Sequence, residues 1–178
     1  MNLLILDIDE TLLYATGRPL ERDPDAVLES YHVYLRPYLA EFLAVVSGLF
    51  EVAIWTSASE TYAREVVPIL PLPEAPRFVW SHDRCTRRFN PETQTHYFLK
   101  DLKKVARLGY DLNRVIIVDN TPRKIARQYG NLVRVVDFTG SPQDDELRLL
   151  SLYLPQLSER NDIRSIEKRG WRDQVRGG

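Results

Sequence analysis

Four short apolar runs, separated by segments with helical spacing, constrain the fold of this chain more than any other feature. The runs are rich in Val, Ile and Leu and lie at Leu3–Ile8, Val52–Trp55, Val115–Val118 and Leu132–Val136. Uninterrupted apolar runs of this length are typical of strands buried on both faces, as in parallel sheets. Because these strands alternate with helices, we expect an α/β fold: a three-layer Rossmann-like sandwich around a mostly parallel central sheet.

Helical patterns fill the intervals between the runs. After Pro37, apolar residues repeat at helical spacing at Leu39, Phe42, Leu43 and Val46. Further helices are predicted after a capping box of Ser57 and Glu60, from Leu102 to Gly109, after Thr121-Pro122, and from Gln143 to Leu154 before Pro155.

Two segments interrupt the alternation. The strand-like composition of Tyr31–Leu35 predicts a small β flap after the first strand. Residues 77–98 are predicted to form a β-hairpin insert, with Phe78-Val79-Trp80 leading out and His96-Tyr97-Phe98 returning around the turn signal Asn90-Pro91-Glu92. Neither segment is long enough to form a large cap domain.

The length and composition of the chain predict one domain. A chain of 178 residues with 44% hydrophobic composition can bury one sizeable core but is too short for two ordinary domains. We place the domain at residues 1–157. The polar segment 158–178, which carries Trp171, is expected to be a loosely attached C-terminal tail.

Charge and cysteine content limit the partners. The chain has 24 basic and 25 acidic residues, so no global field favours nucleic acid or an anionic membrane. The single cysteine, Cys85, leaves no partner for an internal disulfide. We see no secretory leader pattern and no apolar stretch that could span a bilayer, and therefore expect a cytoplasmic protein without a membrane partner.

The first apolar run ends in an acidic motif, Asp7-Ile8-Asp9-Glu10-Thr11. Two carboxylates at the end of a buried strand repel each other and each needs a donor or a cation, so the arrangement favours Mg²⁺, which takes oxygen ligands. One carboxylate can then attack phosphorus while the other moves protons. A simple turn cap is an alternative for the motif alone. A calcium loop is excluded, because its required Gly and Glu are replaced by Leu12 and Arg18.

Polar residues also follow the later strands. Thr56-Ser57 follows the second run, Lys100 lies between the hairpin and the next helix, and Asp119-Asn120 follows the third run. Ligands of open α/β sheets bind beyond the carboxyl ends of the strands. Each residue alone has an ordinary structural explanation: Thr56 could cap a helix, Lys100 could be a solvated lysine, and Asp119 could form a turn. Together, at successive strand ends, they predict a single site.

This ordered set resembles the haloacid dehalogenase superfamily of phosphotransferases. The motifs match as Asp7-Ile8-Asp9-Glu10-Thr11, Thr56-Ser57-Ala58-Ser59, Lys100-Asp101-Leu102 and Val118-Asp119-Asn120-Thr121-Pro122. They are most similar to the branch of carboxy-terminal-domain phosphatases and nuclear-LIM-interactor-like factors, which also carries the pattern seen in Arg36-Pro37 and Glu41-Phe42-Leu43. The resemblance covers roughly residues 3–140 and implies a phosphoric monoester hydrolase.

The resemblance implies a role for each motif. Asp7 would be the nucleophile that forms an aspartyl-phosphate, and Asp9 would protonate the leaving oxygen and later deprotonate water. Thr56, the N–H of Ser57 and Lys100 would hold the phosphoryl oxygens.

The resemblance also implies a metal cofactor. Mg²⁺ would be held by the Asp7 carboxylate, the Asp9 main-chain carbonyl and Asn120, with Asp119 close by.

Without a large cap domain the site would be open, which favours a bulky phosphorylated substrate such as a phosphoprotein or a nucleic-acid end. Arg87 and Arg88 in the hairpin are candidates for binding a second phosphate or a nucleic-acid backbone; a solvated, charged hairpin edge is the alternative. The branch seats a substrate proline in an apolar pocket, but we align Gly17 and Ser59 with that pocket. Proline-directed specificity is therefore not expected.

Other functions remain as alternatives. A receiver-like domain that accepts a phosphoryl group also combines acids, a hydroxyl, a lysine and Mg²⁺, and a phosphatase of small metabolites would use the same motifs. A catalytically idle binding module is disfavoured by the intact motifs. The residues His82, Cys85 and His96 lack a recognised zinc-ligand spacing.

Overall fold

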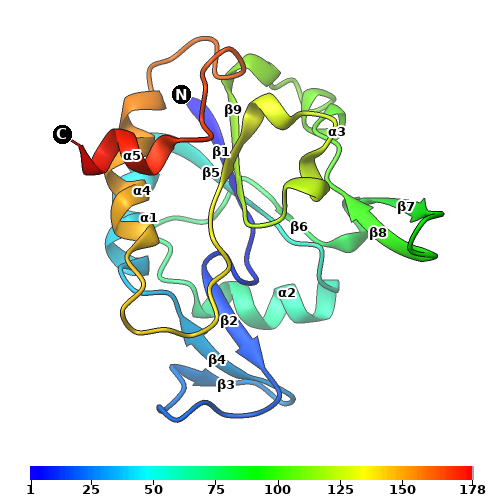
Figure 1. The fold of residues 1–178 in the computed structure, drawn as a ribbon, viewed down its shortest axis with the longest axis vertical. Helices are drawn as coiled ribbons and strands as arrows, with labels where there is room; N and C mark the ends of the chain where they lie inside the picture. The colour runs from blue at the N-terminus through cyan, green and yellow to red at the C-terminus, as the bar shows by residue number, and fades with distance from the viewer. Residues whose placement is uncertain (178) are drawn as a thin grey trace.

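A five-stranded parallel sheet forms the centre of the molecule (Figure 1). The computed structural model describes residues 1–177. The strands lie in the order β10-β9-β1-β5-β6, with bounds Leu132–Arg134, Val115–Asp119, Asn2–Leu6, Phe50–Trp55 and Val79–Trp80. Every neighbouring pair is parallel, and all four predicted apolar runs belong to this sheet. Both the α/β class and the parallel sheet are thus confirmed.

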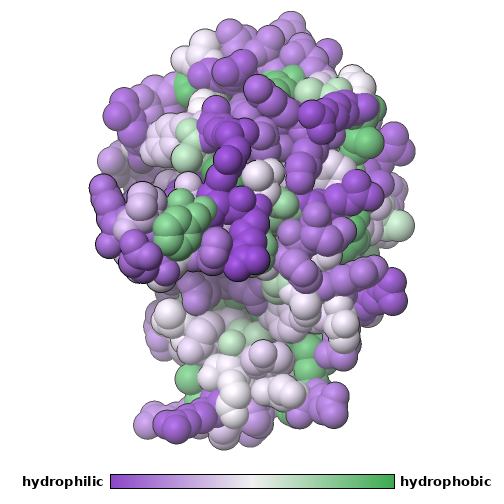
Figure 2. Space-filling model, turned by 90° about the vertical axis from the view of Figure 1, so that its right-hand side faces the viewer, coloured by the Kyte–Doolittle hydropathy of each residue, from purple (hydrophilic) through white to green (hydrophobic). Residues whose placement is uncertain are grey.

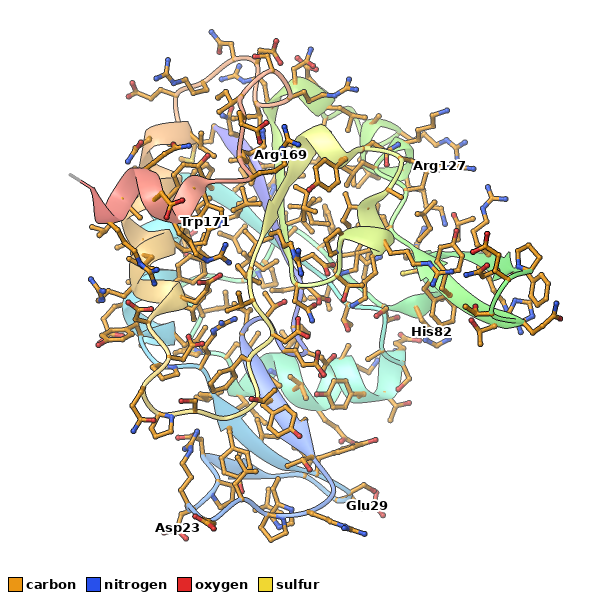
Figure 3. The ribbon with its side chains drawn as sticks, in the orientation of Figure 1. Asp23, Glu29, His82, Arg127, Arg169 and Trp171 are labelled. Carbon is orange, nitrogen blue, oxygen red and sulfur yellow. The ribbon has the colours of Figure 1, made fainter. Side chains whose placement is uncertain are left out.

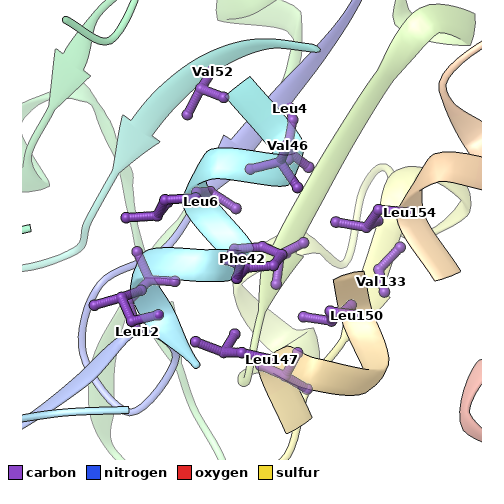
Figure 4. Packing of buried hydrophobic residues seen from close by; sticks show 14 of the residues in the cluster. Leu4, Leu6, Leu12, Phe42, Val46, Val52, Val133, Leu147, Leu150 and Leu154 are labelled. Atoms are coloured by element: carbon purple, nitrogen blue, oxygen red, sulfur yellow. The ribbon is translucent and has the colours of Figure 1, made fainter. Parts of the chain in front are cut away.

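The sheet lies between two separate apolar layers. Leu4 and Leu6 on β1 pack against α1 (Leu39–Ser47) and α4 (Glu146–Tyr153), as Figure 4 shows. Leu3 and Ile5 point to the other face, toward the segment that contains α3 (Lys103–Ala106). Since successive strand residues alternate between faces, one apolar strand serves both layers. The predicted three-layer sandwich is confirmed.

Several helix ends differ from the prediction. The helix α2 (Glu60–Val66) starts at Ser59, whose Oγ accepts a hydrogen bond from the Tyr62 N–H at 3.2 Å, so the capping box at Ser57 is wrong. The residues after Thr121 form only a short 3₁₀ helix, η4 (Pro122–Ile125). The last predicted helix continues through Pro155 as the 3₁₀ helix η6 (Leu154–Leu157), because proline in a first turn has no N–H to leave unpaired.

The remaining 3₁₀ helices are short connectors. They are η1, η2, η3 and η5, at Val67–Ile69, His82–Arg84, Leu112–Arg114 and Tyr129–Asn131. Within residues 1–177, no helix combines the length and the hydropathy needed to cross a bilayer.

The predicted flap is a small antiparallel sheet. It contains β2 (Leu13–Thr16), β4 (His32–Leu35) and β3 (Ala26–Val27), in the order β2-β4-β3. The flap lies beyond the carboxyl end of β1, next to α2 (Figure 1). The predicted strand at Tyr31–Leu35 corresponds to β4.

The predicted hairpin exists, but its first strand was misplaced. The hairpin is β7 (Thr86–Asn90) paired with β8 (Thr95–Leu99), and it projects from the body of the molecule (Figure 1). The apolar segment around Val79 and Trp80 instead forms β6 at the edge of the central sheet. Trp80 is buried edge-to-face against Trp55, with ring centroids 4.9 Å apart. Burial of these large rings draws the segment into the sheet rather than into a solvated hairpin.

The C-terminal segment packs on the domain, so the expectation of a loosely attached tail from residue 158 is wrong. Ile163 and Trp171 are buried. The Trp171 indole N–H donates to the Arg134 carbonyl at 2.9 Å, and its ring lies 5.5 Å from that of Tyr153 on α4. Trp171 starts the short helix α5 (Trp171–Arg176), beside α4 (Figure 3). A few apolar residues spaced along a polar segment are enough to anchor it.

Candidate active site

The predicted polar residues meet at the carboxyl end of the sheet. Asp7 directly follows β1, Thr56 follows β5 and Asp119 ends β9. In the register of the sheet, Leu6 lies opposite both Ile54 and Val118, so these three strands end side by side.

Lys100 belongs to the same cluster and comes from the end of β8, the second strand of the hairpin. It follows β8, and its backbone N–H donates to the Lys124 carbonyl at 2.7 Å, which fixes the end of the hairpin next to η4. The side chain has no exposed surface, and its Nζ donates to Asp7 Oδ1 at 2.7 Å and to Asp119 Oδ2 at 2.6 Å. One lysine thus bridges two buried carboxylates from neighbouring strands.

Asp7 is held in its ionised form. Burial alone would raise the pKa of this carboxyl, but the charges of Lys100 and Lys124 outweigh burial and lower the pKa. The Lys124 Nζ lies 3.4 Å from Asp7 Oδ2, and the Thr11 hydroxyl donates to the same oxygen at 3.5 Å. An ionised carboxylate against two cations at a strand end has the properties of a nucleophile.

Asp9 lies in a different environment, only two residues away. Burial raises its pKa and the Asp7 charge adds to this, although hydrogen bonds from two hydroxyls partly oppose the shift. Tyr62 Oη on α2 donates to Asp9 Oδ1 at 2.5 Å, and Thr56 Oγ1 donates to Asp9 Oδ2 at 3.3 Å. A carboxyl with a raised pKa can carry a proton nearer to neutral pH, as a general acid must.

The Lys100–Asp119 pair completes the buried charge network. Asp119 also accepts the Thr121 N–H on Oδ1 at 2.8 Å. Burial, followed by the Asp7 charge, raises the pKa of Asp119, and the Lys100 charge opposes this shift. The two carboxylates raise the pKa of Lys100 in spite of its burial, which keeps the amine protonated.

Oxygen donors suited to Mg²⁺ surround this strand end. The Asn120 amide donates to Glu10 Oε2 and to Asp137 Oδ1, both at 3.1 Å, so further carboxylates lie beside the motif residues. Mg²⁺ prefers carboxylate and amide oxygens, and the donor set fits this ion in its chemistry. Among residues 1–177 no three His, Cys, Asp or Glu side chains are grouped as a metal cluster. The ligand set expected from the resemblance, with one amide and one main-chain carbonyl, stays a prediction.

The other predicted substrate-binding residues lie around this centre. Ser57 is half-buried directly after Thr56. Arg87 and Arg88 are exposed on β7, away from the buried network, and neither forms an ion pair within the described part of the chain. Arg88 lies opposite Tyr97, whose ring is stacked under the Arg123 guanidinium at 3.9 Å. The hairpin side of the molecule is predominantly hydrophilic (Figure 2).

His82, Cys85 and His96 do not form a group of metal-ligating side chains within residues 1–177. His82 lies between α2 and the hairpin (Figure 3), with Nδ1 3.2 Å from the Ala58 carbonyl. Cys85 is a buried free thiol, and burial raises its pKa, which makes it a poor nucleophile.

Three site residues escaped the sequence analysis. Lys124 follows the Thr121-Pro122 motif, and its proximity to that motif was the available signal. Tyr62 lies in the helix predicted after Ser57 and Glu60, and helical spacing gives no sign that its hydroxyl contacts Asp9. Arg36 was noted as part of the resemblance only; its Nη1 donates to the Thr11 carbonyl at 3.0 Å and so holds the end of the acidic motif.

Comparison with known proteins places this geometry in a family. The chain is 31% identical over 172 residues to human carboxy-terminal domain RNA polymerase II polypeptide A small phosphatase 1, covering 92% of this chain and 62% of that protein. It is 33% identical over 171 residues to CTD small phosphatase-like protein 1 of Caenorhabditis elegans, covering 92% of this chain and 32% of that protein. The chain therefore spans less than two thirds of these relatives.

Solved structures share the fold at low sequence identity. The fission yeast RNA polymerase II CTD phosphatase Fcp1, in an R271A variant bound to beryllium fluoride, superposes with a TM-score of 0.57 at 19% identity, over 99% of this chain and 49% of that one. A protein from Listeria monocytogenes serotype 4b gives a TM-score of 0.61 at 18% identity, over 89% and 99% of the two chains. The sequence model of the NLI interacting factor-like phosphatases matches residues 2–164. The chain belongs to the NLI interacting factor-like phosphatase family.

Proposed function

We propose that this chain is a Mg²⁺-dependent phosphatase that hydrolyses phosphate monoesters through an aspartyl-phosphate on Asp7. One observation carries the proposal: Asp7 lies against the ammonium groups of Lys100 and Lys124, whereas Asp9, two residues away, accepts hydrogen bonds from the hydroxyls of Tyr62 and Thr56. These surroundings lower the pKa of Asp7, while burial raises that of Asp9, which suits the two carboxyls to opposite roles, an ionised nucleophile and a proton donor.

In the first step, an Asp7 carboxylate oxygen attacks phosphorus and the bond between phosphorus and the leaving oxygen breaks. Asp9 transfers its proton to that oxygen, which leaves as an alcohol. Lys100 has three N–H donors, of which two are used on Asp7 and Asp119, and the third is available for a phosphoryl oxygen. The Thr56 hydroxyl, which would turn from Asp9 to the substrate, and the N–H of Ser57 lie on the β5 side of the same site and would donate to the remaining oxygens.

In the second step, Asp9 acts in its ionised form. It removes a proton from a water molecule as that water attacks the phosphorus of the aspartyl-phosphate, which releases phosphate and restores the Asp7 carboxylate. The hydroxyl of Tyr62 holds the Asp9 carboxyl in place through both steps.

The proposed metal ligands are the Asp7 carboxylate, the Asp9 main-chain carbonyl and Asn120, with Asp119 close by. When bound, Mg²⁺ would reduce the repulsion between the Asp7 carboxylate and the anionic phosphate. The lysines Lys100 and Lys124 contribute to the same neutralisation from within the chain.

The proposed substrate is a phosphoprotein. Two relatives are named for small phosphatases of the carboxy-terminal domain of RNA polymerase II or for likeness to them, which favours a polypeptide over a nucleic-acid end or a small metabolite. Arg87 and Arg88 on the hairpin are proposed to contact the substrate chain, since their guanidinium groups carry no carboxylate partner among residues 1–177.

The test uses the purified chain with an aryl phosphate and with phosphopeptides. Activity should disappear on chelation and return with Mg²⁺. Asp7→Asn should abolish hydrolysis while leaving the circular dichroism spectrum unchanged, and Asp9→Asn should accumulate an acid-quenched phosphoenzyme detectable by mass spectrometry. Full activity of Asp7→Asn would overturn the nucleophile assignment. A wild-type phosphoenzyme that persists for hours would favour the receiver-like alternative instead.

A further inference from the structure

A cavity of about 400 Å³ opens directly beside Asp9. The flap contributes Glu29 and Tyr31 to its wall, and α2 contributes Tyr62 and Glu65. Figure 1 shows the flap next to α2, and Figure 3 places Glu29 on the flap. We call this cavity the flap pocket.

The position of the flap pocket follows the path of the leaving group. If Asp9 protonates the leaving oxygen, that oxygen must come within about 2.6–3.2 Å of its carboxyl. Whatever is attached to the oxygen then extends away from the buried Lys100 side of the site. Asp9 lines the flap pocket, so the substrate adjacent to its phosphorylated residue meets these walls.

The walls suit a positive charge. Two exposed glutamates, Glu29 and Glu65, lie in the lining, and no lysine, arginine or histidine does. The rings of Tyr31 and Tyr62 pack edge-to-face, with centroids 5.7 Å apart, and leave aromatic surface toward the cavity. Aromatic faces attract ammonium and guanidinium groups, and glutamates add direct charge attraction.

The same walls favour the alternatives less. A proline could pack on the tyrosine rings but, being uncharged, would gain nothing from the carboxylates of Glu29 and Glu65. A glutamate or a second phosphate on the substrate would be repelled by Glu29 and Glu65. Anionic parts of a substrate are better placed on the other side of the site, toward Arg88 on the hairpin.

We propose that the flap pocket binds a lysine or arginine side chain of the substrate next to the phosphorylated serine or threonine, so that this chain prefers phosphorylation sites with a basic neighbour. The inference rests on the proposed phosphatase function and names its substrate class. Binding of the cation between the tyrosine rings and the glutamates would orient the leaving oxygen on Asp9 before reaction.

The experiment compares phosphoserine peptides that differ at one position beside the phosphoserine. Lysine, arginine, alanine, proline and glutamate are placed there, on each side in turn, and kcat/KM is measured at low and at high salt. We expect kcat/KM for the lysine and arginine peptides to exceed that for the alanine and proline peptides by about tenfold, because the cation would gain a cation–π contact and the attraction of the glutamates. The glutamate peptide should be slower than alanine, and added salt should reduce all charge-dependent differences.

Charge reversal in the wall sharpens the test. The double variant Glu29→Lys/Glu65→Lys should reverse the order, with the glutamate peptide now faster than the lysine peptide. Glu41→Lys, which changes an exposed glutamate on α1 that is not among the pocket-lining residues, is the matched control and should keep the wild-type order.

The outcomes separate the two proposals. If the aryl phosphate is hydrolysed and all peptides are hydrolysed with the same kcat/KM, the preference for a basic neighbour is refuted, while the phosphatase function is still supported. An unchanged order in the double variant would also refute the flap pocket as the source of any preference. Failure to hydrolyse any phosphate ester in the presence of Mg²⁺ would refute the phosphatase function and this inference with it.

Discussion

Breaking the ion pair between Arg36 and Asp144 by removing one partner is expected to cost more stability than breaking any exposed pair among residues 1–177. Arg36 Nε and Nη2 donate to the two Asp144 oxygens at 2.7 and 2.9 Å, and the Arg36 side chain has no exposed surface while that of Asp144 is 13% exposed. Through its bond to the Thr11 carbonyl, Arg36 also ties the loop before α4 to the end of the acidic motif. Its loss should therefore affect both stability and the site.

Arg36→Met and Asp144→Ala should lower the free energy of unfolding by different amounts. Removal of one partner of a buried pair costs about 3–5 kcal/mol, because the other charge stays buried without compensation. Arg36→Met leaves Asp144, which can regain some water, so we expect the lower end of that range. Asp144→Ala leaves a fully buried guanidinium without a partner, so its loss of unfolding free energy should lie at the upper end of that range. At about 2–4 °C per kcal/mol for a chain of this size, Tm should fall by about 6–12 °C and 10–20 °C respectively.

Urea unfolding with a double-mutant cycle measures these terms. Arg36→Met/Asp144→Ala removes both charges, closes the cycle with the two single variants and should cost less than Asp144→Ala alone. Arg148→Met, which breaks an exposed pair with Asp145 in the same region, is the matched control and should cost at most about 1 kcal/mol. Additive losses in the double variant, or an Asp144→Ala cost no larger than that of the control, would refute the reasoning.

Four further outcomes are expected. Lys100→Ala should lower kcat on an aryl phosphate by about 10²–10³-fold or more, because a buried donor to the phosphoryl group is lost, whereas His96→Ala on the hairpin should leave it unchanged. Asp9→Asn, measured in the presence of a chelator, should raise the free energy of unfolding at neutral pH, because a carboxyl with a raised pKa destabilises the fold when it is ionised. This gain should vanish as the pH falls below 3.8, the ordinary pKa of an aspartate. Equal stability of the variant and the wild type at pH 7 would contradict the reasoning. Tyr62→Phe removes a donor that favours ionised Asp9, so the alkaline limb of kcat/KM for a poor leaving group should shift to higher pH; an unshifted limb would mean a purely structural tyrosine. Trp171→Ala should cost about 3–5 kcal/mol in urea unfolding, and a loss below about 1 kcal/mol would mean that the C-terminal segment is not part of the core.

Much of the sheet and the centre of the site could be predicted from the sequence, because both depend on local patterns. Apolar runs identify buried strands, and the residue after each run necessarily lies at the carboxyl edge. For this reason Asp7, Thr56 and Asp119 could be assigned to one edge before their distances were known. Lys100 was also placed there, although it comes from the hairpin.

What could not be predicted depends on contacts between segments far apart in the chain. Two residues, Val79 and Trp80, are too few to distinguish a sheet edge from a hairpin strand, and the choice is made by packing against Trp55. The anchoring of the C-terminal segment depends likewise on the burial of Trp171 against residues far away in the chain. The role of Tyr62 could not be read from helical spacing, because its ring satisfies the apolar pattern while its hydroxyl serves the site.

The different behaviour of Asp7 and Asp9 arises from the position of β1 between β9 and β5. Asp7 meets cations from the β8 and η4 side, and Asp9 meets only neutral hydroxyls from β5 and α2. The motif itself is nearly symmetric, so the proposed division of labour would come from its two neighbouring strands. The buried carboxyl with a raised pKa reduces stability, which is the expected cost of a site kept for its chemistry.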